Sequence, residues 1–142
     1  MTRYESKQQQ ILHPAQQIYL TLEKFSNFTP LIGDKVEGWC ADDDQCSFTA
    51  KGMKFVLKIV DRQPAKVIKI VPGEGGIPIQ FSFWIQMKEV GDNDTRIRLV
   101  LDIELNFMLR TMVGNKLQDM LNKVAEGLAM GFNNPNAGAW NF

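Results

Sequence analysis

The sequence of 142 residues has few of the features that mark secreted, metal-binding or membrane-spanning proteins. Its two cysteines, Cys40 and Cys46, are too few for a disulfide framework or a four-thiolate zinc site. The single histidine, His13, has no carboxylate or thiol spaced to join it in a metal site. No window approaches the roughly 18 consecutive apolar residues of a membrane-spanning helix. We therefore expect no metal, no cofactor and no membrane insertion.

An excess of charge of one sign is also missing. Sixteen lysine and arginine side chains balance sixteen aspartate and glutamate side chains, so the charge balance gives no sign of a nucleic-acid partner or an anionic membrane. The first ten residues lack the apolar core of a signal peptide, and we expect the cytoplasm as the location. The glycine-rich segment 72–78 lacks the Lys-Ser/Thr pair and the following helix of a phosphate-binding loop.

What is present is the composition of a globular domain, with 44% hydrophobic and 23% charged residues. The segment 3–12 is expected to be a first strand, although it is polar for its length. Helical spacing predicts a short helix over 14–25, and a second is expected over 26–33, where Asn27 suits its start and Gly33 its end. A period of two then continues through six strands in three hairpins, with turn residues at each tip. From about 107 to 131 the period returns to 3.6. We expect one domain over 1–132 and an irregular tail over 133–142.

This order of elements resembles the START-like helix-grip superfamily, also called SRPBCC. The resemblance rests on "HPAQQIYLTLEKFSNFTPLI" after the first strand, "VEGWCADDDQCSFTAKGM" across the second and third strands, and the C-terminal amphipathic helix. It implies an α+β fold, in which a seven-stranded curved antiparallel sheet wraps around a long C-terminal helix and two short helices follow strand one. It also implies an internal apolar cavity that binds or carries a lipid, an aromatic or a polyketide-like compound. A polyketide cyclase or dehydratase is the alternative that the same superfamily offers.

The hairpin turns predict which side chains share the inner face of the sheet. A turn centred on Asp92 sets Phe83 opposite Leu101, and a two-residue turn at Gln63-Pro64 sets Ile59 opposite Ile68. The acidic turn at 42–44 sets Cys40 opposite Cys46. Together with the helix stripe, these registers predict a ligand cavity closed by the second short helix. Its expected residues are Ser6, Gln8, Phe28, Leu31, Phe48, Phe55, Phe81, Phe83, Leu101, Met112 and Met120.

Two interpretations of these residues stay open at this stage. The apolar side chains either line a cavity or fill an ordinary core, and Ser6 and Gln8 either orient a ligand or belong to a solvated edge strand. We expect no catalytic residue, because the carboxylates of the last strands fall on outward or tip positions and Cys40 and Cys46 are more typical of inert buried thiols. A binding module is therefore favoured over an enzyme. An interaction protein with an incidental pocket is the third class.

The outer face of the sheet carries a tryptophan. The same registers set Trp84 opposite Val100 and beside Val67, with Val67 facing Val60, and together they predict an apolar outer patch. One interpretation is a homodimer through this patch. The other is a cover made by the C-terminal tail, which carries Trp140 and Phe142.

Overall fold

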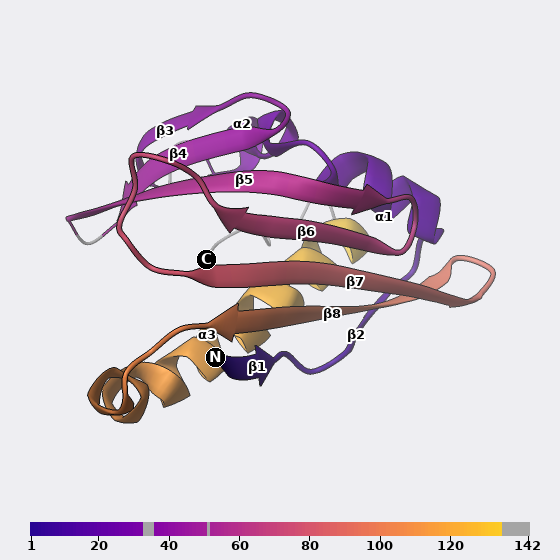
Figure 1. The fold of residues 1–142 in the computed structure, drawn as a ribbon. Helices are drawn as coiled ribbons and strands as arrows, with labels where there is room; N and C mark the ends of the chain where they lie inside the picture. The colour runs from indigo at the N-terminus through magenta and orange to yellow at the C-terminus, as the bar shows by residue number, and fades with distance from the viewer. Residues whose placement is uncertain (33–35, 51, 135–142) are drawn as a thin grey trace.

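The computed structural model describes residues 1–32, 36–50 and 52–134, with the side chains of Leu31, Ile32 and Leu109 left undescribed. Within these residues a single antiparallel sheet curves in front of one long helix (Figure 1). Its strands are β1 (Thr2–Glu5), β2 (Gln9–Ile11), β3 (Glu37–Ala41), β4 (Gln45–Ala50), β5 (Met53–Gln63), β6 (Val67–Pro72), β7 (Phe81–Gly91) and β8 (Asp94–Ile103). The helices are α1 (Ala15–Leu22), the 3₁₀ helix η1 (Phe25–Phe28), α2 (Thr29–Ile32) and α3 (Phe107–Asn133).

The strands follow the order β1-β8-β7-β6-β5-β4-β3, and β2 also pairs with β8. The α+β architecture with a long C-terminal helix is confirmed, but the sheet has eight strands where seven were predicted. The difference arises at Ser6, which divides the expected first strand. The hydroxyl of Ser6, in place of a main-chain carbonyl, accepts a hydrogen bond from the Leu99 amide at 2.9 Å. The ladder with β8 is therefore interrupted there, and it resumes at Gln9.

The hairpin between β7 and β8 has the predicted register, with Phe83 opposite Leu101 and Trp84 opposite Val100. The hairpin between β5 and β6 differs from the prediction. Ile59 pairs with Ile70 and not with Ile68, because the turn comprises residues 64–66 and a bulge lies between Ile59 and Asp61. The longer turn and the bulge compensate each other, so Ile59 keeps its place on the inner face.

The predicted pairing of Cys40 with Cys46 is wrong. The turn comprises residues 42–45, one more than predicted, so that Cys46 pairs with Ala41 and Cys40 pairs with Ser47, and a bulge between Glu37 and Cys40 follows farther along β3. Neighbouring strand residues point to opposite faces. Cys40 is therefore exposed while Cys46 is buried, and the two thiols lie on opposite sides of the sheet.

α3 lies behind the sheet and packs mainly on β1, β2 and β8 (Figure 1). Ala125 and Ala129 are buried in this contact, where small side chains let the helix approach the sheet edge closely. Three side-chain amides of α3 bond the main chain of the N-terminal segment. Gln118 donates to the Glu5 carbonyl, Asn122 accepts from the Lys7 amide, and Asn133 bonds both Gln10 and Leu12.

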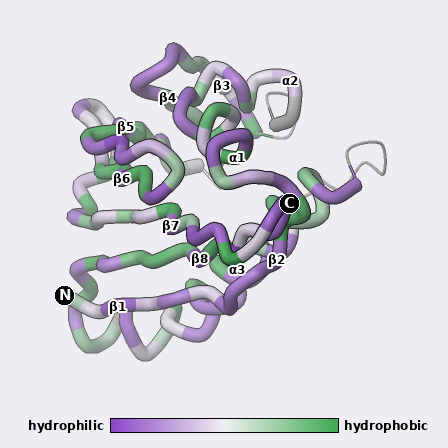
Figure 2. Tube along the Cα trace, turned by 90° about the vertical axis from the view of Figure 1, so that its right-hand side faces the viewer, coloured by the Kyte–Doolittle hydropathy of each residue, from purple (hydrophilic) through white to green (hydrophobic). Residues whose placement is uncertain are grey.

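The core lies between the sheet, α1 and α3. Its fully buried members include Ile18 and Leu22 of α1, Ile68 of β6, Leu99 of β8 and Leu121 of α3. Figure 2 shows hydrophobic segments concentrated along β5 to β8, whereas the acidic turn between β3 and β4 is hydrophilic. The core is thus formed mainly by the inner face of the sheet.

A candidate ligand site on the inner face of the sheet

Burial along the inner face of the sheet changes from one end to the other. In β7 the inward residues Phe81 and Phe83 are half-buried, while Ile85 and Met87 are buried. In β5 the exposure of inward residues falls in the same way from Met53, which is exposed, to Ile59, which is buried. Because antiparallel neighbours run in opposite directions, the starts of β5 and β7 lie at the same end of the sheet as the ends of β6 and β8. We call this the open end.

The opposite end of the inner face is closed by α1. Ile18, Tyr19 and Leu22 are buried there against the same core cluster as Ile85 and Met87. The α1 start is fixed by Glu89, whose carboxylate accepts a hydrogen bond from the Ala15 amide at 3.0 Å. No comparable cover is found at the open end within the described residues, so the apolar side chains there remain partly accessible.

The inner wall is the set of half-buried apolar residues near the open end. Its members are Phe48, Phe55, Leu57, Phe81 and Phe83. The rings of Phe48 and Phe55 are stacked, with centroids 5.4 Å apart. Trp39 extends this row, because its ring centroid lies 6.1 Å from that of Phe48 and its indole nitrogen donates to Thr29.

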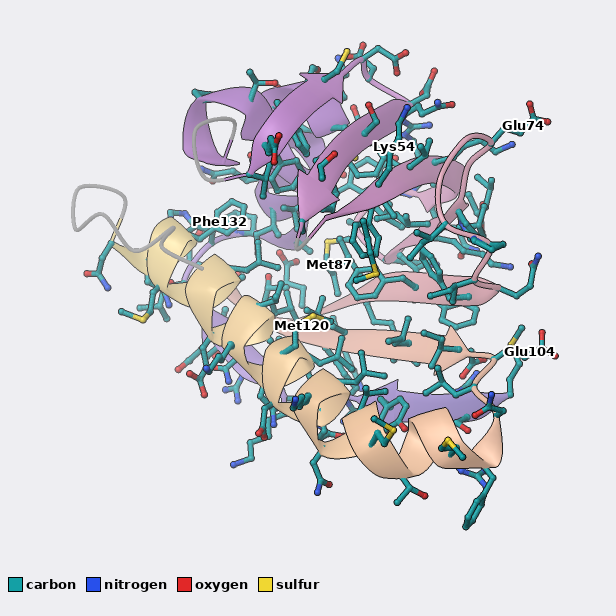
Figure 3. All side chains as sticks on the ribbon, turned by 90° about the vertical axis from the view of Figure 1, so that its left-hand side faces the viewer. Lys54, Glu74, Met87, Glu104, Met120 and Phe132 are labelled. Atoms are coloured by element: carbon teal, nitrogen blue, oxygen red, sulfur yellow. The ribbon has the colours of Figure 1, made fainter. Side chains whose placement is uncertain are left out.

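Four of the eleven predicted cavity residues, Phe48, Phe55, Phe81 and Phe83, belong to this wall. Leu101 is buried between Tyr4 and Phe83 in the strand register, and Phe28 packs half-buried against the core. Leu31 lies outside the residues whose side chains are described. In Figure 3, Met120 lies on α3 and Met87 on β7, on facing sides of the interior. Met120 is still 46% exposed.

Met112 does not join the wall. It lies nine positions before the buried Leu121, which is two and a half helical turns, so the two side chains lie on opposite sides of α3. Met112 is accordingly 65% exposed. The prediction had included Met112 in the helix face that contacts the sheet because methionine is hydrophobic. The arc that actually faces the sheet contains Gly114, where an added Cβ would lie 2.9 Å from the Tyr4 hydroxyl oxygen.

The two polar residues of the prediction lie elsewhere. The Ser6 hydroxyl is engaged with the main chain, because it accepts from the Leu99 amide and donates to the Lys7 carbonyl. Gln8 is exposed in the break between β1 and β2. Tyr4 and Leu57 were expected on the inner face of the sheet but not among the cavity residues, and the alternation of the second strand set Trp39 on the outer face. The turn over residues 42–45 is one residue longer than predicted, and it moves Trp39 to the inner face, beside the bulge at Gly38, whose φ is 67°.

Charged groups on the inner face of the described strands are held at its closed end. Besides Glu89, the inward residue Arg62 donates to the main chain of Glu23 and Asp43 and forms a 2.8 Å ion pair with Asp44. Burial raises the pKa of the Cys46 thiol to about 12, so it stays protonated and weakly nucleophilic at neutral pH. Among the described residues, no three His, Cys, Asp or Glu side chains gather as a metal site.

The outer face differs from the predicted apolar patch. Val100 is only 2% exposed, and Val60 lies at the bulge of β5, so it does not face Val67. Trp84 is half-buried, and the Arg3 guanidinium and the Lys69 amine lie 5.6 and 5.4 Å from its ring centroid.

Arg3 is held in that position by Asp102. Two hydrogen bonds of 2.7 and 2.8 Å join the guanidinium to both carboxylate oxygens. Hydrogen bonding from Arg3 lowers the pKa of the Asp102 carboxyl. The surface around Trp84 is therefore mixed in character, with cations over an aromatic ring.

A separate hollow of about 680 Å³ lies on the outside of α1 and is open to solvent. Its lining residues are Pro14, Gln16, Gln17, Leu20, Thr21 and Asn27. This lining comes from α1, the residue before it and one residue of η1, and none of the lining residues is buried. The inner wall is the better candidate, since it combines aromatic side chains from several strands.

No protein-family model matches the sequence, and no curated protein matches it. Solved structures resemble it in fold. A Thermus thermophilus protein known from its crystal structure has a TM-score of 0.70 at 16% identity, over 96% of this chain and 100% of its own. The Aha1 dimer from Colwellia psychrerythraea gives 0.62 at 13%, over 96% and 100%.

A START superfamily protein from Mycobacterium smegmatis gives a TM-score of 0.61 at 12% identity, over 89% of this chain and 96% of its own. Similarity at this level of identity reports on fold. None of the helices in the described residues is long and apolar enough to cross a membrane. The similarity to these solved structures shows that the chain has the START-like helix-grip fold, as its sequence resemblance implied.

Proposed function

We propose that this chain binds an apolar or amphipathic small molecule on the inner wall, between the open end of the sheet and α3. One observation carries the proposal: the inward side chains of β5 and β7 are buried at one end and partly accessible at the other. A filled core would bury both ends alike. Large apolar side chains that are left half-exposed on one concave face are typical of ligand sites.

The chemistry of the wall defines the class of ligand. Phe48, Phe55, Phe81 and Phe83 offer aromatic surface, and the charged inward residues of the described strands are engaged at the closed end. An acyl chain or a ring system would gain roughly 25 cal/mol for each Å² of apolar surface removed from water. A free charge on the buried part of the ligand would find no partner on this wall. A polar head would therefore stay toward solvent.

Titration with a fluorescent fatty acid tests the proposal. The variant Phe81→Ser removes a half-buried ring at the open end, and Val90→Ser changes an exposed apolar residue at the other end of β7. Loss of about half the burial of one aromatic side chain, some 1.4 kcal/mol, should weaken binding about tenfold. The Val90 variant should bind like the unmodified protein.

Equal affinities of the two variants, or no binding by the unmodified protein, would refute the proposal. Native mass spectrometry of freshly purified protein supplies an independent measurement, since a bound apolar compound would add its mass to that of the chain. Return of a chemically altered compound from the wall would instead support a cyclase or dehydratase.

A further inference from the structure

The inner face of β1 carries a tyrosine at the side of the inner wall that adjoins α3. Tyr4 pairs with Leu101 in the strand register, and Leu101 pairs with Phe83 of the wall. Neighbouring strands lie about 4.8 Å apart, so the Cα atom of Tyr4 lies about 10 Å from that of Phe83 along this row. The Tyr4 side chain packs half-buried against the core. Tyr4 therefore borders the inner wall on the side of the helix.

The Tyr4 hydroxyl is directed at Gly114 of α3. A Cβ added to Gly114 would lie 2.9 Å from the hydroxyl oxygen and 3.8 Å from two carbons of the Tyr4 ring. Glycine inside a helix is less favourable than alanine, but here its missing side chain leaves room for the hydroxyl. The polar end of Tyr4 thus lies between the sheet and α3, on the side of the wall where a ligand would contact the helix.

The same hydroxyl has no hydrogen-bond partner among the described residues. A buried tyrosine hydroxyl usually finds such a partner. Within the described residues no buried polar side-chain atom is left unpaired, so the Tyr4 hydroxyl must be accessible from outside the protein. Two polar neighbours are already engaged, since the Ser6 hydroxyl accepts from the Leu99 amide and Gln118 donates to a main-chain carbonyl. Tyr4 therefore offers an unused donor at the border of an apolar wall.

We propose that the Tyr4 hydroxyl donates a hydrogen bond to a neutral carbonyl oxygen of the ligand, and that the inner wall thereby selects apolar ketones or esters over hydrocarbons of the same shape. This inference rests on the proposed function and names the chemical class of the ligand. The apolar body of the ligand lies on Phe81 and Phe83, and its oxygen faces Tyr4 beside Gly114. One polar group in an otherwise apolar site fixes the orientation of what binds there.

The charges near this position favour a neutral group on the ligand. The charged inward residues of the described strands are engaged at the closed end. Arg110, one helical turn before Gly114, is exposed, and its guanidinium lies 5.8 Å from the centre of the Phe107 ring. A carboxylate or an ammonium group beside Tyr4 would lose its hydration without an opposite charge in return. A carbonyl oxygen loses less on leaving water and needs one donor, which the phenol supplies.

Calorimetric titration with two probes of nearly equal shape tests the inference. Acetylnaphthalene carries a ketone oxygen, and ethylnaphthalene has a methylene group in its place. Tyr4→Phe removes only the hydroxyl, so it should weaken acetylnaphthalene binding about fivefold and leave ethylnaphthalene binding unchanged. The matched control is Tyr19→Phe, because Tyr19 is the second tyrosine of the chain and is buried at the closed end. This control should bind both probes like the unmodified protein.

The carbonyl stretching frequency of bound acetylnaphthalene supplies a second measurement, which structural damage does not imitate. With an isotopically labelled carbonyl, the frequency should be lower on the unmodified protein and on Tyr19→Phe than on Tyr4→Phe, because a hydrogen bond weakens the C=O bond.

Three results would overturn the inference and leave the proposed function standing: equal frequencies on all three proteins, unchanged ketone affinity in Tyr4→Phe, or an equal loss of affinity for both probes in that variant. Binding of the fluorescent fatty acid without binding of acetylnaphthalene would have the same meaning. If the unmodified protein binds neither these probes nor the fatty acid, the proposed function fails as well.

Discussion

Asn133 is predicted to be the main clamp between the end of α3 and strand β2. Its side-chain oxygen accepts from the Leu12 amide at 2.7 Å, and its side-chain nitrogen donates to the Gln10 carbonyl at 2.9 Å. Each such hydrogen bond contributes about 0.5–1.5 kcal/mol net. Water can replace part of both bonds at this exposed position. Asn133→Ala should therefore lower the free energy of unfolding by about 1–2 kcal/mol.

The matched control is Asn134→Ala, because the Asn134 side chain is exposed beside the clamp. Urea unfolding should show the midpoint falling for Asn133→Ala and unchanged for the control. Hydrogen exchange gives the sharper measurement, since the Leu12 amide should lose protection in the Asn133 variant alone. Equal midpoints together with an unchanged Leu12 exchange rate would show that packing of α3, and not this side chain, holds the edge.

Three further predictions concern other parts of the sheet. Gly76→Ala should destabilise the fold by about 1–3 kcal/mol, because the added Cβ would lie 2.9 Å from the Val56 amide nitrogen. Gly91→Ala should be tolerated in the same unfolding assay, and equal losses of stability in the two variants would refute this prediction. Burial raises the pKa of Cys46 to about 12, whereas an unfolded thiol titrates near 8.5. The free energy of unfolding should therefore fall between about pH 9 and 12 more steeply in the unmodified protein than in Cys46→Ala. Parallel curves of stability against pH for the two proteins would contradict this. The variant Trp84→Glu should lose self-association through the outer face. If sedimentation shows that the unmodified protein and the variant are both monomers, the predicted interface is refuted.

The tail alternative for Trp84 involves Trp140 and Phe142, which lie outside the described residues. Deletion of residues 133–142 would separate it from self-association. Because the deletion also removes the Asn133 clamp, Asn133→Ala is the necessary reference. A stability loss beyond that of the point variant would favour the tail as the cover of the outer face.

The sequence alone determined the order and type of most elements. Alternation of Phe81, Phe83, Ile85 and Met87 predicted both the strand and its inward side, since side chains of a strand alternate strictly between faces. The β7–β8 register from Phe81 to Glu89 followed as well, although a bulge lies between Glu89 and Gly91 next to the turn. The long helix was predictable within two residues at its end, because its period of 3.6 extends over several turns.

The registers of β3–β4 and β5–β6 could not be predicted in this way. Each turn is one residue longer than predicted, at 42–45 and 64–66, and each hairpin also contains a bulge, which leaves no clear local signal in the sequence. The consequence is largest at Trp39 and Cys40, which changed faces. The first short helix was predicted to end at residue 25, three residues later than α1 does. The second was predicted over 26–33 as one helix, whereas the structure has η1 followed by α2, because the residues of this 3₁₀ segment also suit an α-helix.

Only the tertiary structure decided which parts of the apolar surface stay accessible. The sequence showed a helix with methionines and small residues, but contact with the sheet edge selected the arc of Gly114, Ala125 and Ala129, because only small side chains permit that approach. Met112 was thereby turned to solvent. Along the strands the alternation of inward and outward side chains continues from one end of the sheet to the other. α1, however, covers the inner face at one of these ends and not at the other. Local pattern fixes the face of a side chain, whereas burial depends on the elements that pack against that face.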